Sequence, residues 1–138
     1  MILHAFTDGA SRGNPGESGI GLIVKSEKGE TILSEYGYIG LATNNIAEYS
    51  ALIALLKKIK KVQHTKLIVH SDSELMVRQL NGEYKVKDEN IRKYYQRVVK
   101  LVDGEASKVE FRHIPRSENS EADRLANKGI ESRKKIRI

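Results

Sequence analysis

The chain has 138 residues, a length that fits one domain with its own hydrophobic core. It contains no cysteine, which excludes disulfides, thiolate catalysis and zinc held by cysteine. Lys and Arg number 24 against 18 Asp and Glu, and the resulting net charge of +6 favours a polyanion as partner. No stretch is long and apolar enough to span a bilayer, and the first residues lack the regions of a signal peptide. We therefore expect a cytoplasmic protein with no membrane partner.

Three strand-like runs open the chain. Residues 2–7 are mostly apolar, and Gly9 begins a glycine-rich stretch that predicts a turn. Two further apolar runs, 20–24 and 31–39, flank a polar turn at 27–30. This arrangement predicts that the second and third strands form a hairpin.

Helices and strands alternate in the rest of the chain. A long helix is predicted by apolar residues at helical spacing, namely Ile46, Tyr49, Ile53, Leu56 and Ile59. The elements expected after it are a strand at 67–69, a short helix at 73–81, a helix at 91–102, a strand at 109–114 and a helix from Asn119. An initial hairpin followed by alternating elements predicts an α/β fold with a mixed sheet and helices on both faces.

Two aspartates follow strand-like runs. Asp8 is expected to close the first strand and Asp72 the fourth. If those strands are parallel neighbours, the two carboxylates lie side by side at the edge where ligands collect in α/β sheets. The alternative for each aspartate is a turn residue or a helix N-cap.

Two further acids fall in the first turns of predicted helices. Glu48 lies at the edge of the apolar stripe of the long helix and is expected to face the sheet. Its alternative is a capping box with Asn45 as the N-cap. Asp123 lies at the start of the last helix, where the helix dipole alone would favour an acid.

Carboxylates grouped together repel one another unless a cation neutralises them. A site made only of oxygen ligands selects hard metals such as Mg²⁺ or Mn²⁺. Four acids could hold two such ions at the spacing used in phosphodiester cleavage. The residues alone leave open whether the four acids converge.

Four local motifs occur in the order found in one known family. They are Thr7-Asp8-Gly9-Ala10-Ser11 with Gly13-Asn14-Pro15-Gly16, then Thr43 to Tyr49, then Ser71-Asp72-Ser73, and finally Asn119 to Asp123 with Leu125-Ala126. Together they resemble the motifs of type 1 ribonuclease H over nearly the whole chain. The resemblance implies a ribonuclease H-like fold with a five-stranded mixed sheet and helices on both faces.

The resemblance also implies a function. It makes the chain an endoribonuclease that hydrolyses the RNA strand of an RNA–DNA hybrid by a two-metal-ion mechanism, leaving 3′-hydroxyl and 5′-phosphate ends. Carried over position by position, the ligands of the two Mg²⁺ or Mn²⁺ ions are Asp8, Glu48, Asp72 and Asp123. The residues matching contacts to the RNA strand are Asn14, Asn44 and Asn45, and Thr43 matches a contact to a DNA phosphate. An amide both donates to and accepts from a 2′-hydroxyl.

The chain departs from many family members in three places. Many have a histidine before the last helix that helps the product to leave, and here the candidates are Arg116 and His113. We favour Arg116, because Phe111 and Ile114 indicate that His113 still belongs to the strand. Many also carry a basic, Trp-containing protrusion, whereas the loop at 80–87 is short and the chain has no Trp, as in compact forms. Glu74 stands where many have a glutamine that contacts RNA.

Two alternatives stay open at this stage. One is a catalytically weak module that binds hybrid or double-stranded nucleic acid on the same fold, and the other is a different nuclease on that fold. We expect a monomer that takes RNA–DNA hybrid, with double-stranded RNA as a second candidate substrate. We expect the catalytic domain to cover residues 1–131 and a basic tail to cover 132–138. The tail is either a disordered arm or packs back on the sheet through Ile136 and Ile138.

Overall fold

The computed structural model describes residues 1–138. It contains five strands, four α-helices and one 3₁₀ turn. In chain order they are β1 (Ile2–Gly13), β2 (Gly16–Ser26), β3 (Thr31–Ala42), α1 (Asn44–Ile59), β4 (Lys66–Ser71), α2 (Glu74–Leu80), α3 (Glu89–Asp103), β5 (Lys108–His113), η1 (Arg116–Glu118) and α4 (Ser120–Ser132).

All five strands belong to one sheet with the order β3-β2-β1-β4-β5. The first three strands pair antiparallel, whereas β4 is parallel to both β1 and β5. The long helix α1 connects β3 to β4, which is the crossover that a change from antiparallel to parallel pairing requires. The predicted mixed α/β sheet is confirmed.

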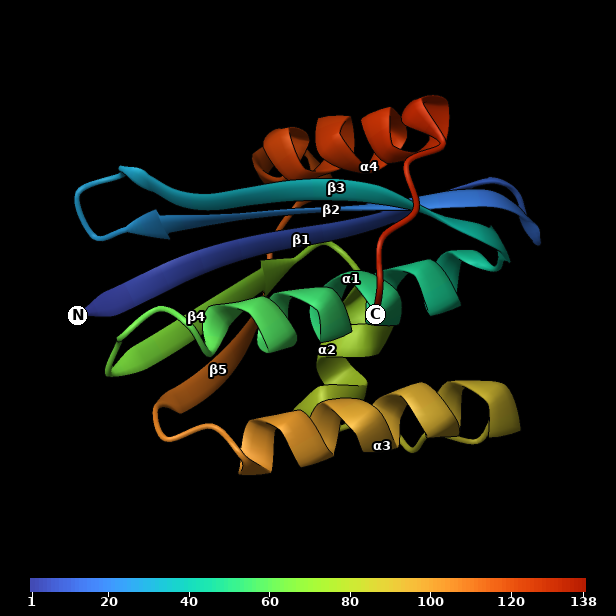
Figure 1. Cartoon of the computed structure of the whole chain (residues 1–138). Helices are drawn as coiled ribbons and strands as arrows, with labels where there is room; N and C mark the ends of the chain where they lie inside the picture. Colours follow the sequence, from blue (N-terminus) through green and yellow to red (C-terminus); the bar gives the residue numbers. More distant parts are fainter.

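Helices cover the two faces of the sheet unequally. Helices α1, α2 and α3 lie on one face, and α4 lies alone on the other, over β1, β2 and β3 (Figure 1). The main core forms under α1, where apolar side chains of β1, β2 and β4 meet the fully buried residues of that helix. None of the helices is long and apolar enough to cross a membrane.

The first strand is longer than the sequence indicated. Strand β1 continues through Gly9 to Gly13, so the expectation that Asp8 closes this strand is wrong. The reason is that β1 has two partners of different reach. Its parallel pairing with β4 ends at Thr7, opposite Ser71, while its antiparallel pairing with β2 continues to Gly13, opposite Gly16. The glycine-rich stretch therefore belongs to a β1–β2 hairpin that the sequence analysis did not predict.

The elements after β1 agree with those expected from the sequence. The predicted hairpin of the second and third strands is confirmed as β2 and β3. His113 is the last residue of β5, and Ile114-Pro115 follows as the predicted exit. Arg116 begins the 3₁₀ turn η1 instead of an irregular loop.

The last six residues pack against the edge of β3. The Tyr38 N–H donates to the carbonyl of Lys134 (2.7 Å), and the Ile136 N–H donates to the carbonyl of Tyr38 (3.3 Å). Ile136 and Ile138 are partly buried against the main core, so the tail passes from the α4 side of the sheet to the α1 side (Figure 1). Of the two alternatives for the tail, the structure has the packed one.

Close contact between α4 and the sheet depends on glycines. A Cβ added to Gly21 would lie 2.5 Å from the Ala122 carbonyl oxygen, and one added to Gly19 would lie 2.4 Å from that of Ala126. On the helix itself, a Cβ on Gly129 would lie 2.4 Å from the Gly37 oxygen of β3. These glycines set how near α4, and with it Asp123, comes to β1 and β2.

We therefore predict that Gly129→Ala destabilises the protein. At an ordinary helix position this change stabilises by about 1 kcal/mol. Here the added methyl meets backbone, and overpacking of that kind costs about 1–3 kcal/mol. Thermal denaturation measures the sign. Gly104→Ala is the control, because its Cβ would lie 3.5 Å from its nearest neighbour. A Gly129→Ala variant as stable as Gly104→Ala would contradict the packing described here.

Candidate active site

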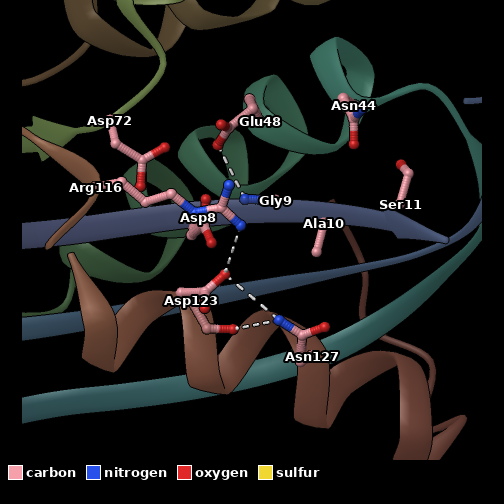
Figure 2. A pocket seen from close by; sticks show the side chains of 10 residues that line it. All are labelled: Asp8, Gly9, Ala10, Ser11, Asn44, Glu48, Asp72, Arg116, Asp123 and Asn127. Atoms are coloured by element: carbon pink, nitrogen blue, oxygen red, sulfur yellow. Dashed lines mark hydrogen bonds and ion pairs between the residues drawn. The ribbon is translucent and has the colours of Figure 1, made fainter.

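A polar cleft of about 310 Å³ opens where β1 leaves β4. Ten residues from both faces of the sheet line it (Figure 2), namely Asp8, Gly9, Ala10, Ser11, Asn44, Glu48, Asp72, Arg116, Asp123 and Asn127. All four acids singled out in the sequence are among them. The cleft is therefore the place where the chain gathers its candidate chemistry.

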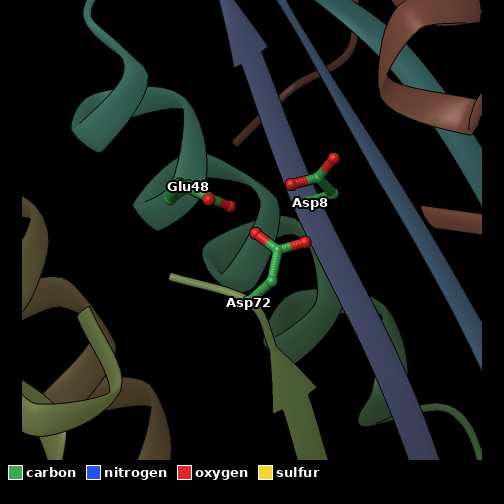
Figure 3. A group of neighbouring side chains, drawn as sticks. All are labelled: Asp8, Glu48 and Asp72. Atoms are coloured by element: carbon green, nitrogen blue, oxygen red, sulfur yellow. The ribbon is translucent and has the colours of Figure 1, made fainter. Parts of the chain in front are cut away.

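Three of these acids form a compact group. One carboxylate oxygen from each of Asp8, Glu48 and Asp72 lies within 4.8 Å of the others (Figure 3). Parallel pairing causes the contact between the aspartates. Thr7 is the register partner of Ser71, so the next residue of each strand is an acid, and both acids emerge at the same edge. The expectation that the strand alignment brings Asp8 and Asp72 together is confirmed.

Glu48 reaches this group from the other layer of the fold. Its Oε1 accepts a hydrogen bond from the Gly9 N–H (2.9 Å). A Cβ on Gly9 would lie 2.2 Å from the Ala47 carbonyl carbon, so only glycine lets α1 approach β1 this closely. The alternative role of Glu48, in a capping box with Asn45 as the N-cap, is wrong. The N-cap of α1 is Thr43, whose Oγ1 accepts a hydrogen bond from the Ile46 N–H (3.2 Å).

Asp123 approaches from α4, on the opposite side of Asp8 from Glu48 (Figure 2). It stands outside the compact group of three. The Asn127 Nδ2 donates to the Asp123 carbonyl (3.0 Å) and to its Oδ1 (3.4 Å), and the Arg116 Nη2 lies 4.0 Å from that same Oδ1. The Arg116 side chain is 84% exposed, so it contacts the cleft from the solvent side.

Burial and mutual repulsion act strongly on this group. Burial raises the pKa of Asp8 to about 9, and the charges of Glu48 and Asp72 add to that effect. Burial also raises the pKa of Glu48 to about 8, with Asp72 adding to the effect, although the Gly9 N–H and Arg116 oppose it. Clustered, desolvated carboxylates need either protons or a cation to be stable. Their all-oxygen donor set fits a hard divalent cation such as Mg²⁺ or Mn²⁺.

The residues expected to contact substrate lie next to the cleft. A second hollow of about 360 Å³ is lined by Asn14, Thr43, Asn44 and Asn45 together with Ile46, Asp88, Asn90 and Ile91. The Asn14 Oδ1 accepts from the Asn44 N–H (3.0 Å), which ties the β1–β2 hairpin to the start of α1. Asn44 lines both hollows, so the two adjoin at this residue.

Two other candidates lie outside the cleft. Glu74 begins α2 with an exposed side chain that pairs with Arg78 (3.2 Å), and it does not line the cleft. His113 is exposed at the end of β5 and does not line it either. Sequence reasoning missed Asn127, although its spacing of four residues from Asp123 on a helix would have indicated it.

We predict that Asp8→Asn stabilises the protein in EDTA. The pKa of Asp8 is raised on folding, so the wild type loses stability as the pH rises from about 4 towards 9, because the unfolded chain ionises first. The variant lacks this loss. The unfolding free energy of the variant should match that of the wild type near pH 4 and exceed it at pH 8 by on the order of 2 kcal/mol. Melting temperatures recorded across this pH range measure the difference.

Glu30→Gln is the control for this experiment, because it removes one exposed carboxylate from the turn before β3. It should show no gain that grows with pH. Saturating Mg²⁺ should stabilise the wild type more than Asp8→Asn, since a ligand bound to the folded state raises its stability. If Asp8→Asn is no more stable than the wild type at pH 8 in EDTA, burial and repulsion of the carboxylates do not destabilise the fold.

Comparisons with known proteins identify the family of this chain. The family model described as "Reverse transcriptase-like" matches residues 6–129. A bifunctional protein of Mycobacterium tuberculosis is 40% identical over 96% of this chain, and ribonuclease HI of Halobacterium salinarum is 37% identical over 94% of it. The chain spans only 36% of the first of these relatives and 64% of the second.

Solved structures indicate the same family, and they match over nearly the whole length of both chains. LC11-RNase H1, in complex with an RNA/DNA hybrid, superposes with a TM-score of 0.90 and is 39% identical, with 94% of this chain and 97% of that one covered. RNase H1 of Halobacterium salinarum also gives 0.90 at 36% identity, with 96% and 99% covered. With its sheet order, its cluster of acids and these relatives, the chain belongs to the reverse transcriptase-like family and, within it, to the type 1 ribonucleases H.

Proposed function

We propose that this chain is an endoribonuclease that hydrolyses the RNA strand of RNA–DNA hybrids with the help of two divalent metal ions. The observation that carries the proposal is the convergence of Asp8, Glu48 and Asp72, with Asp123 across the cleft. Family membership supports it, because this family depends on divalent metals. LC11-RNase H1, which has been solved with an RNA/DNA hybrid, supports the substrate class.

The four acids are the residues that would hold Mg²⁺ or Mn²⁺. Such ions supply Lewis-acid activation of the attacking water and stabilise charge on the leaving oxygen. The chain's own part is to present the four carboxylates around one polar cleft. Glu48 is oriented by the Gly9 N–H and Asp123 by Asn127, so neither has to reorganise when a substrate phosphate arrives.

The hollow beside the acids supplies substrate recognition. Asn14, Asn44 and Asn45 carry amides that can donate to and accept from a 2′-hydroxyl, the group that distinguishes RNA from DNA. Thr43 lies at the N-terminus of α1, where the positive end of the helix dipole favours a phosphate. The four side chains adjoin the cleft through Asn44, so one duplex could contact both the hollow and the cleft that holds the acids.

A cleavage assay on matched substrates tests the function. The purified chain with Mg²⁺ or Mn²⁺ should cut the RNA strand of a hybrid and leave the same sequence as double-stranded DNA intact. Double-stranded RNA is the third arm, because the amides would also find 2′-hydroxyls there. Binding to hybrid without cleavage in either metal would favour the weak binding module instead.

We predict that Asp72→Asn reduces hybrid cleavage at least about 100-fold, because the lost carboxylate is part of the group that makes the nucleophile reactive. The protein should stay folded, since the change relieves repulsion. Initial rates on hybrid measure the loss, and Glu30→Gln serves as the matched removal of one negative charge outside the cleft. Cleavage by Asp72→Asn at close to the wild-type rate would show that the site is elsewhere.

We also propose that Arg116, and not His113, assists turnover. Arg116 lines the cleft 4.0 Å from Asp123, whereas His113 ends β5 outside it. Arg116→Ala should lower kcat several-fold with little change in hybrid affinity, and His113→Ala should do much less. Arginine stays charged near neutrality and cannot act as a general acid or base, so its contribution should be electrostatic. Steady-state rates decide, and a larger kcat loss from His113→Ala would overturn the assignment.

A further inference from the structure

Asn119 connects three parts of the active site. It stands immediately before α4, and only 1% of its surface is exposed. Its Nδ2 donates to the Thr7 carbonyl of β1 (2.9 Å) and to the Asp72 Oδ2 that follows β4 (2.9 Å). One amide group thus links two strands and a helix at the point where the acids meet.

The orientation of this amide follows from its neighbours. Both atoms near Nδ2 are oxygens without a hydrogen to donate, a carbonyl and a carboxylate. The reversed orientation would set Oδ1 against two acceptors, so the nitrogen must face them. The Oδ1 is then buried and has no hydrogen-bond partner within the protein.

Asn119 also does not perform the role that its position favours. Asparagine before a helix normally accepts a hydrogen bond from the first turn. At the other three α-helices the residue in this position does so, namely Thr43, Ser73 and Asp88. Asn119 makes no such bond. Its side chain is turned away from the helix and towards Asp72. As a result α4 lacks a side-chain cap, and the Oδ1 of Asn119 lacks a hydrogen-bond partner.

We propose that Asn119 is a positioning residue that orients the Asp72 carboxylate for metal binding. The bond from Nδ2 engages one of the two oxygens of Asp72 and restrains rotation of that carboxylate relative to β1, which carries Asp8. Because Thr7 precedes Asp8, the second bond of the same amide ties the two aspartates to one reference point. This inference rests on the proposed metal site.

Titration of Mn²⁺ into the protein by calorimetry tests the role without any cleavage. Asn119→Ser keeps a side chain able to cap α4 but too short to reach Asp72. Its Mn²⁺ dissociation constant should be about tenfold weaker than that of the wild type, the effect typical of a residue that orients a metal ligand. The control is Asn81→Ser, whose amide also donates to a strand carbonyl, that of Phe111 (3.2 Å), but touches no carboxylate. Its affinity should not change.

A cycle with Asp72→Asn separates positioning from general stability. In the Asp72→Asn background, Asn119→Ser should weaken Mn²⁺ binding no further, because the group it acts through is already lost. Asn119→Ala, which also removes the unpaired Oδ1, is the second variant if the serine variant does not fold. An affinity within twofold of the wild type in either folded variant would overturn the inference, as would additive losses in the cycle.

The outcomes for this inference and for the proposed function can be told apart. If the wild type binds Mn²⁺ but cleaves no hybrid, the proposed nuclease activity fails, while the comparison of affinities still decides the role of Asn119. If the wild type cleaves hybrid and the Asn119 variants bind Mn²⁺ normally, the nuclease stands and Asn119 is a structural residue only.

Discussion

The repulsion among buried carboxylates is the constraint on which the rest of the structure depends. Asp8 and Asp72 are brought together by the parallel pairing of β1 and β4, and Glu48 is added by the close approach of α1. Because the repulsion among these carboxylates destabilises the folded chain, other contacts must supply the stability of the fold. The fully buried core under α1 and the contact of α4 with the glycines of β2 supply that stability. The site is thus held in place by packing, and its own charges oppose it until a cation arrives.

Much of this arrangement could be predicted from the sequence. The apolar periodicity of α1 and the short apolar run of β4 indicate a helical crossover from β3 to β4, which makes these two strands parallel. Since β1 and β3 are both antiparallel to β2, β4 is then also parallel to β1. The sequence could then place Asp8 and Asp72 side by side only on the condition that the first and fourth strands are neighbours, which the structure shows. Asp123 was expected because it shares a short motif with Asn119. Periodicity and motif order carry this information because they reflect which faces are buried.

What could not be predicted depends on partners distant in the chain. The end of β1 was misplaced because glycines usually mark turns, and here Gly9 instead makes room for Ala47 of α1. Asn45 was considered as the helix cap, although Thr43 has that role, because both residue types favour it. The orientation of the Asn119 amide depends on Thr7, 112 residues away. No local pattern contains such a contact.

The packed tail has a consequence for how copies of this protein meet. A strand at the edge of a sheet exposes N–H and C=O groups that can pair with another chain. On β3 the groups of Tyr38 are instead bonded to Lys134 and Ile136. At the other edge, the Asn81 amide occupies the carbonyl of Phe111 on β5. Both borders of the sheet are thereby interrupted by the protein's own chain, which protects it against edge-to-edge aggregation.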